Sequence, residues 1–94
     1  MKVTIEFTGA IRSITGQKEI ALDLPDQGTY RDLIRWLVRK YPALVGILID
    51  QDGETFLSAN MFVINGDLRT PAMVMQESPQ EGDRLILMSL ITGG

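Results

Sequence analysis

The stretch YRDLIRWLVRKY, residues 30–41, has its apolar residues at the spacing of an amphipathic helix. Thr29 precedes it and can cap a helix, and Asp32 stands three positions later, where a capping box places an acidic side chain. Pro42 follows and disfavours helical backbone at Tyr41. The sequence therefore predicts a helix here, whose buried stripe is formed by Tyr30, Leu33, Ile34, Leu37, Val38 and Tyr41.

Two segments before this helix alternate between polar and apolar residues. In KVTIEFT (2–8) the residues Val3, Ile5 and Phe7 share one face, and KEIALDL (18–24) repeats the pattern. Such alternation is typical of half-buried strands. GAIRSITG (9–16) is bounded by glycines, and we interpret it as a connection. The first part of the chain is therefore predicted to be a hairpin.

The chain after the helix is predicted to return to strands. Residues 47–49 fit either a short strand or an irregular crossing, whereas NMFVIN (60–65) is a strand that ends in a tight Asn65-Gly66 turn. Residues 68–75 are interpreted as a short edge strand, because Pro71 cannot donate to a central ladder. Residues 84–91 are almost continuously apolar. This order indicates a single α+β domain over residues 1–94, with one main helix packed on one face of a mixed sheet of four to five strands.

The composition excludes several classes of function. The 94 residues include no Cys and no His, which removes zinc-thiolate chemistry and most nucleophile–base pairs. DQDGE (50–54) fails the calcium-loop template because no Glu stands at its twelfth position. The net charge of −3 and the scattered cations argue against nucleic-acid binding. The start MKVTIEFTGA alternates polar and apolar residues instead of forming the apolar run of a signal peptide, and no segment approaches 18 apolar residues, so we expect a cytoplasmic chain. Without Cys, His or a calcium loop, we expect no bound metal.

The chain ends in LILMSLITGG, and this end carries a reactive group, the α-carboxylate of Gly94. Activation by ATP as an acyl-adenylate would make its carbon open to attack by a sulfur donor or by a lysine amine. Thr92, Gly93 and Gly94 together extend over roughly 10 Å, and glycines lack the side chains that would block a narrow channel. The sequence therefore predicts a flexible tail over residues 92–94 that enters another protein's active site.

Three further segments, taken with this tail, carry a resemblance. FTGAIRSITG (7–16), FVINGDLR (62–69) and EGDRLILM (81–88) occur in the order found in the ubiquitin-like β-grasp sulfur carriers. The chain most resembles the small subunit of molybdopterin synthase, and it is also similar to the thiamin-pathway sulfur carrier. The resemblance covers essentially the whole chain and implies a ubiquitin-like β-grasp fold.

The resemblance implies a non-catalytic sulfur donor in molybdenum cofactor biosynthesis. Gly94 would be adenylated by an ATP-dependent, E1-like activating enzyme, converted to a thiocarboxylate by a sulfur donor, and inserted into the large synthase subunit. The chain itself would bind no cofactor and would not be an enzyme alone. A thiamin-pathway carrier, a ubiquitin-like protein modifier and a binding module with an inert tail remain alternatives.

A single helix leaves one face of the sheet uncovered. Leu85 and Leu87 share one side of the last strand, and the alternate residues share the other side. We expect an apolar docking face there, unless residues 43–59 cover it. The predicted partner-binding residues are Phe7, Arg12, Ile86, Met88 and Leu90.

Overall fold

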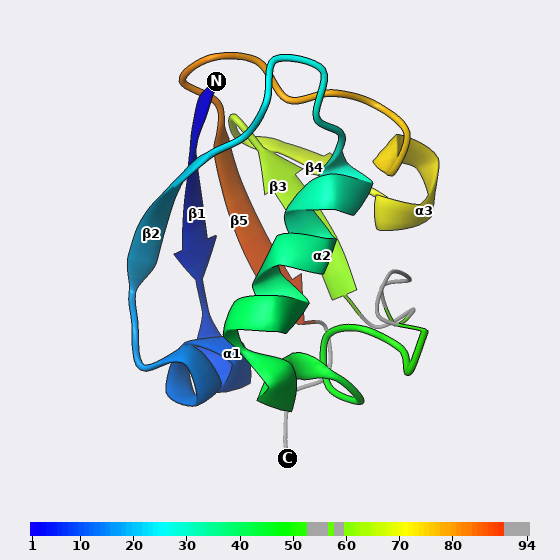
Figure 1. Cartoon of the computed structure of the whole chain (residues 1–94). Coiled ribbons are helices and arrows are strands. Elements are labelled where there is room, and N and C mark those ends of the chain that lie inside the picture. Colours follow the sequence, from blue (N-terminus) through cyan, green and yellow to red (C-terminus); the bar gives the residue numbers. More distant parts are fainter. Residues whose placement is uncertain (53–56, 58–59, 90–94) are drawn as a thin grey trace.

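The computed structural model describes residues 1–52, 57 and 60–89, which form a sheet with helices against it (Figure 1). The described strands are β1 (Lys2–Phe7), β2 (Glu19–Asp23), β3 (Asn60–Ile64), β4 (Asp67–Arg69) and β5 (Arg84–Ser89). The helices are α1 (Gly9–Thr15), α2 (Tyr30–Lys40) and α3 (Pro71–Val74), with a 3-10 turn, η1 (Pro42–Leu44). The predicted α+β class is confirmed.

The strands are ordered β2-β1-β5-β3-β4 in one sheet. β1 and β5 are parallel, with Thr4 opposite Arg84, whereas the other neighbouring pairs are antiparallel. The sheet is therefore mixed, as predicted, and the strand nearest the C-terminus is at its centre. β5 has a hydrogen-bonded strand on each side.

The core lies between the sheet and α2. Its members include fully or almost fully buried side chains from one face of β1, β2, β3 and β5, together with the apolar stripe of α2. Two aromatic contacts join the layers: the rings of Tyr30 and Phe62 are 5.6 Å apart, and those of Phe7 and Tyr41 are 5.9 Å apart. The predicted inward residues Leu85 and Leu87 are both fully buried.

The predicted capping box at the start of α2 is present. The Thr29 hydroxyl oxygen accepts from the Asp32 amide at 3.3 Å, and the Asp32 carboxylate accepts from the Thr29 amide at 2.9 Å. At the other end, the Tyr41 amide donates to the Leu37 carbonyl at 2.7 Å, and Pro42 begins η1. Both helix ends therefore fall where the sequence places them.

We expect Thr29→Ala to lower the free energy of unfolding by about 1 kcal/mol, because the Asp32 amide loses its acceptor at the helix end. Urea denaturation followed by circular dichroism measures this loss. Thr29→Ser keeps the hydroxyl and is the matched control. Equal stability of the Ala and Ser variants would show that the cap contributes nothing.

The interpretation of residues 9–16 as a connection is wrong, because Gly9–Thr15 form α1. Gly16 ends the helix at φ 71°, and its amide donates to the Arg12 carbonyl at 2.9 Å. This left-handed cap suits glycine. Ile11 is fully buried, so packing stabilises a helix that is too short to show periodicity.

Residues 68–75 form two elements instead of the predicted edge strand. β4 ends at Arg69, and Pro71 begins the short helix α3. Proline is favoured in the first helical turn, where its missing N–H costs no hydrogen bond. The predicted tight turn before β4 is confirmed, since Asn65 and Gly66 have φ of 50° and 90°.

Candidate functional site

β5 carries the chain toward its C-terminus. Its last residue, Ser89, pairs with Asn60 of β3, and the Thr8 hydroxyl donates to the Leu87 carbonyl at 2.9 Å. The strand is thus held on the β1 side as far as Leu87 and on the β3 side as far as Ser89. The five residues that follow Ser89 would span at most about 18 Å if extended. Leu90 and the predicted tail residues Thr92, Gly93 and Gly94 lie outside the described residues, and their roles stay predictions.

The face of the sheet away from α2 carries a group of apolar side chains, which we call the apolar strip. Val63 lies opposite both Ile86 of β5 and Leu68 of β4, and Met61 lies opposite Met88. Leu68 is 62% exposed, and the other four are half-buried. The predicted outward placement of Ile86 and Met88 is therefore confirmed, and strands β3 and β4 extend the strip beyond them.

The described part of residues 43–59 contributes to the other side of the sheet. Leu44, Leu48 and Ile49 are fully buried members of the core, and η1 contacts α2 and α1. Residues 47–49 do not form a strand, although Val45 and Ile49 make an isolated bridge. Of the two alternatives, the irregular crossing is therefore the one observed. These residues are additional core, and the strip residues stay partly exposed.

The assignment of Phe7 to the docking face is wrong for this fold. Its side chain is 1% exposed and packs edge-on against Tyr41 in the core. Phe7 shares the inward side of β1 with Val3 and Ile5, which the alternation of the strand already indicates. A buried Phe7 supports the end of the sheet from within and cannot meet a partner directly.

Arg12 lies on α1 and not in a loop, and its side chain is exposed. α1 contacts β5, so Arg12 is carried by an element packed against the strand that leads to the tail. Its role toward a partner stays a prediction.

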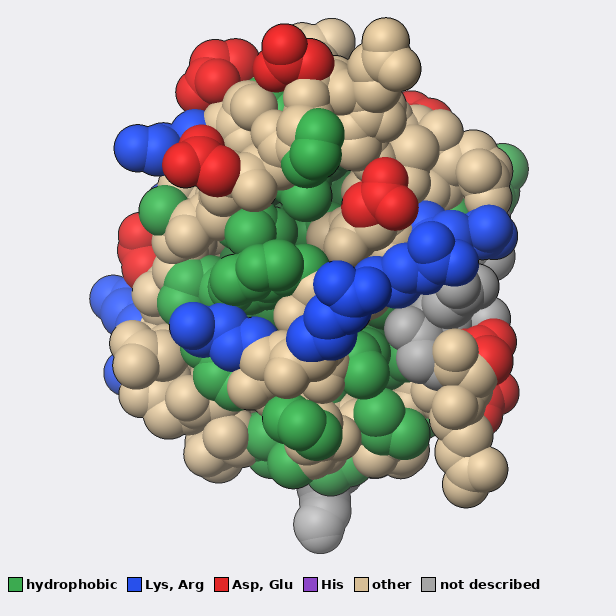
Figure 2. Space-filling model, in the orientation of Figure 1, with side chains coloured by type: hydrophobic (Ala, Val, Ile, Leu, Met, Phe, Trp, Pro, Cys, Tyr) green, Lys and Arg blue, Asp and Glu red, His purple; other side chains and the backbone are tan. Residues whose placement is uncertain are grey.

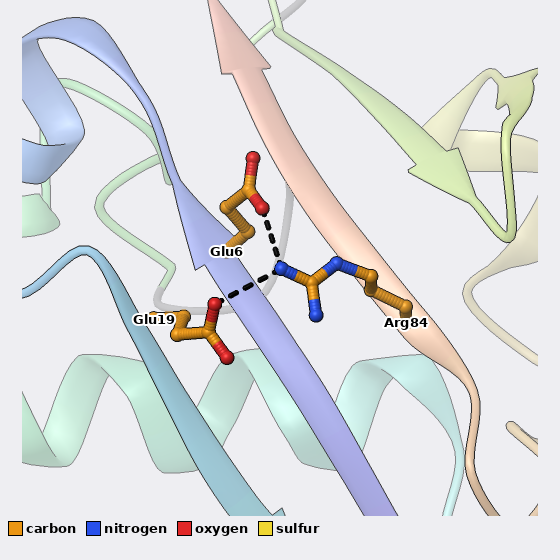
Figure 3. Close-up of polar contacts among 3 residues, drawn as sticks. All are labelled: Glu6, Glu19 and Arg84. Carbon is orange, nitrogen blue, oxygen red and sulfur yellow. Dashed lines mark hydrogen bonds and ion pairs between the residues drawn. The ribbon is translucent and has the colours of Figure 1, made fainter.

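An ion-pair cluster lies on the face of the sheet away from α2 (Figure 3). It is next to the apolar strip, since Glu6 lies opposite Ile86. The Arg84 guanidinium donates from Nη2 to Glu6 at 2.6 Å and to Glu19 at 3.0 Å, which joins β5, β1 and β2. The hydrogen bonds to Glu6 and then Glu19 raise the pKa of Arg84. The outer face is therefore divided into a charged half over β2 and β1 and an apolar half over β3 and β4.

A polar hollow of about 260 Å³ lies between the β3–β4 turn, the start of α2 and the loop before β5. Arg69 and Glu77 form an ion pair of 3.1 Å beside it, and Tyr30 lines it from within. Burial, followed by the nearby Asp83 and Glu77 charges, raises the pKa of Tyr30 to about 12. Tyr30 therefore stays neutral over the physiological range.

Among the residues that the structure describes, no three His, Cys, Asp or Glu side chains form a group that could hold a metal ion. Within the same residues, no helix has the length and hydropathy needed to cross a bilayer.

Comparison with known proteins identifies the family. The model of the ThiS family matches residues 5–94, which includes every strand except the start of β1 and extends through the terminal diglycine. The chain belongs to the ThiS family. ThiS-family proteins are ubiquitin-like sulfur carriers, so the predicted family is confirmed.

Individual relatives of this ThiS-family chain have names that indicate different roles. Small archaeal modifier protein 3 of Haloferax volcanii is 30% identical over the full length of both chains. The crystal structure of SAMP1 from Haloferax volcanii matches with a TM-score of 0.83 at 22% identity, and all of both chains is covered. A putative molybdopterin converting factor, subunit 1, from Pyrococcus furiosus matches with a TM-score of 0.72 at 20% identity, covering 96% of this chain and 98% of that one.

These structural neighbours confirm the ubiquitin-like β-grasp fold. Members of the family act with E1-like activating enzymes and partner enzymes and are generally non-catalytic themselves. The family thus contains both sulfur carriers and protein modifiers.

Proposed function

We propose that this chain is a sulfur carrier whose Gly94 is adenylated and then thiocarboxylated, and that it donates this sulfur as the small subunit of molybdopterin synthase. The observation that carries the proposal is the terminal Gly93-Gly94, placed five residues after a central strand and within the family match. The Pyrococcus furiosus protein, a putative molybdopterin converting factor subunit, has the same fold as this chain. This shared fold is compatible with the proposed role.

The chemistry needs no catalytic side chain from this chain. The Gly94 carboxylate attacks the α-phosphorus of ATP, which forms an acyl-adenylate and releases pyrophosphate. A sulfur nucleophile then attacks the carbonyl carbon and AMP leaves, so that one oxygen is replaced by sulfur. The activating enzyme supplies ATP binding and catalysis, and the large synthase subunit would accept the sulfur.

A protein modifier is the second candidate, and the 30% identity to small archaeal modifier protein 3 favours it. The adenylate is the same in both candidates, but a lysine amine replaces sulfur as the nucleophile and forms an isopeptide. A thiamin-pathway carrier would use the sulfur route with a different acceptor. An inert tail would form no adenylate.

Intact mass spectrometry separates these candidates. The chain is incubated with ATP, the adenylating enzyme of the same organism and sulfide. We expect a gain of about 16 Da, which marks exchange of one oxygen for sulfur. The thiocarboxylated chain is then offered to the large synthase subunit and the pyranopterin precursor, and dithiolene formation tests the acceptor. Lysine-linked adducts without a thiocarboxylate favour the modifier, and an unchanged mass contradicts both.

The apolar strip is proposed to dock on the activating enzyme and the large synthase subunit. We expect Leu68→Glu to weaken binding to the adenylating enzyme by about tenfold or more, because the interface would have to desolvate a charge. Isothermal titration calorimetry measures this affinity.

The matched control is Ala21→Glu, which adds the same charge at an exposed position of β2, in the charged half of the outer face. Its affinity should stay close to that of the original chain. Equal affinity of both variants and the original chain would contradict docking through the strip.

A further inference from the structure

The outward side of α2 concentrates positive charge on an acidic chain. Four of the nine Lys and Arg residues lie within this one helix, at Arg31, Arg35, Arg39 and Lys40, whereas Asp32 is its one acidic residue. The whole chain has a net charge of −3. Figure 2 shows Lys and Arg side chains gathered in a band across this side of the molecule, next to apolar side chains. We call Arg35, Trp36, Arg39 and Lys40 the basic face.

Part of this charge is not neutralised within the described residues. Arg35 has a partner within the chain, whereas no ion pair among the described residues includes Arg39 or Lys40. The Lys40 ammonium instead lies 5.5 Å from the centre of the Trp36 ring and 6.0 Å from that of Tyr41. Such cation–π contacts orient a cation while leaving its charge uncompensated. The basic face can therefore attract carboxylates from outside the chain.

A hollow of about 310 Å³ lies beside these cations, between α2 and the segment that follows β2. Its lining includes the apolar residues Leu24, Pro25 and Trp36 together with Arg35 and Arg39. A water molecule occupies about 30 Å³ in the liquid, so the hollow is large enough for a bulky side chain. The site thus combines an apolar recess with two cations one helical turn apart.

We propose that the basic face is a second docking surface, which binds an acidic protein segment that places one apolar side chain in the hollow between its carboxylates. Trp and Arg are the residue types most often found at the energetic centre of protein interfaces. Arginine also pairs with carboxylates through two parallel hydrogen bonds, which fixes the geometry of the partner. The apolar recess and the flanking cations therefore select the same kind of segment.

The hollow favours a protein over a nucleic acid. Asp23 and Asp32 also line it, and they would repel a phosphate backbone that followed the helix. Nucleic-acid affinity depends on many clustered cations, whereas the chain as a whole is negative.

The basic face and the apolar strip are on opposite sides of the molecule. α2 packs on one face of the sheet, and the strip lies on the other face. A partner on α2 therefore leaves the strip accessible, and the chain could hold two proteins at once. This inference goes beyond the proposed function, since it requires no reaction at the tail.

The test is an NMR titration of the ¹⁵N-labelled full chain with a synthetic peptide in which one leucine is flanked by glutamates. We expect shifts at the amides of residues 35–40 and at the Trp36 indole N–H. The double variant Arg35→Glu/Arg39→Glu should bind at least about tenfold more weakly. Lys2→Glu/Lys18→Glu makes the same change in net charge at exposed positions of other elements and should keep the affinity.

Three comparisons can overturn the proposal. A peptide with serine in place of leucine has the same charge. If it bound with the same affinity as the leucine peptide, the hollow would not recognise an apolar side chain and charge attraction alone would explain binding. If a single-stranded oligonucleotide bound at the same residues more tightly than the peptide, the occupant of the basic face would be a nucleic acid and not a protein. The same shifts on concentrating the chain alone would show that a second copy is the occupant. The titration uses neither ATP nor adenylating enzyme, so its outcome is independent of the mass measurement on the tail.

Discussion

A chain that ends at Gly93 is expected to be thiocarboxylated at least about 100-fold more slowly than the full-length chain, because a misplacement of even 1 Å can cost that much in rate. Loss of Gly94 withdraws the carboxylate by about 3.5 Å from the ATP that activates it. The strand that precedes the tail cannot compensate, since β5 is paired on both sides and Ser89 is held in register with Asn60.

Single-turnover reactions followed by intact mass give this rate. Gly94→Ala keeps the length of the tail but adds a side chain beside the reacting carbon, and we expect a loss of rate there too. Thr92→Ala retains both glycines and is the matched control, with a rate near that of the original chain. A shortened chain that reacts at the full rate would contradict the assignment of Gly94 as the reactive residue.

The second large effect concerns stability. We expect Phe62→Ala to lower the free energy of unfolding by about 3–5 kcal/mol, because it leaves a cavity in the centre of the core. Phe62 is fully buried on β3, lies opposite Leu87 of β5, and packs its ring 5.6 Å from that of Tyr30. Domains of this size have a total stability of about 5–15 kcal/mol, so the variant is expected to be partly unfolded in mild denaturant.

Urea denaturation of the two chains measures this difference. Leu68→Ala on the neighbouring strand is the control, because its side chain is 62% exposed and its loss should change stability by about 0.5 kcal/mol or less. A Phe62→Ala chain as stable as this control would mean that the β3 side of the core is not packed as described.

The elements that could be predicted from sequence are those long enough for a periodic pattern of apolar residues to appear. In a helix this takes more than one turn, and in a strand it takes more than one polar–apolar pair. α2 repeats its apolar spacing over three turns and has signals at both ends, and β1 alternates along its whole length. α1 and α3 have seven and four residues, too few for a period to appear, and each is bounded by Gly or Pro. Their helical form depends on burial of Ile11 and Val74, which is a property of the assembled core.

The candidate site could be predicted in part for the same reason. Alternation along β5 is sufficient to place Ile86 and Met88 outward, but it cannot show that Leu68 and Val63 continue the apolar strip, because that depends on the order of strands. The prediction of Phe7 as a partner-binding residue is wrong, although the alternation of its own strand places it inward. The hollow beside α2 brings Leu24 and Pro25 to Trp36, and no local pattern encodes that contact.

The position of β5 also affects how the domain responds to proteolysis. Without residues 84–89, the sheet would consist of two separate hairpins, β2–β1 and β3–β4. The two hairpins would be joined only through the helices and loops between them. A cut before Arg84 would therefore remove the strand that holds the two halves together as well as the tail. The proposed reactive end is attached to the same strand that completes the sheet, so loss of this strand would remove that end and disrupt the fold together.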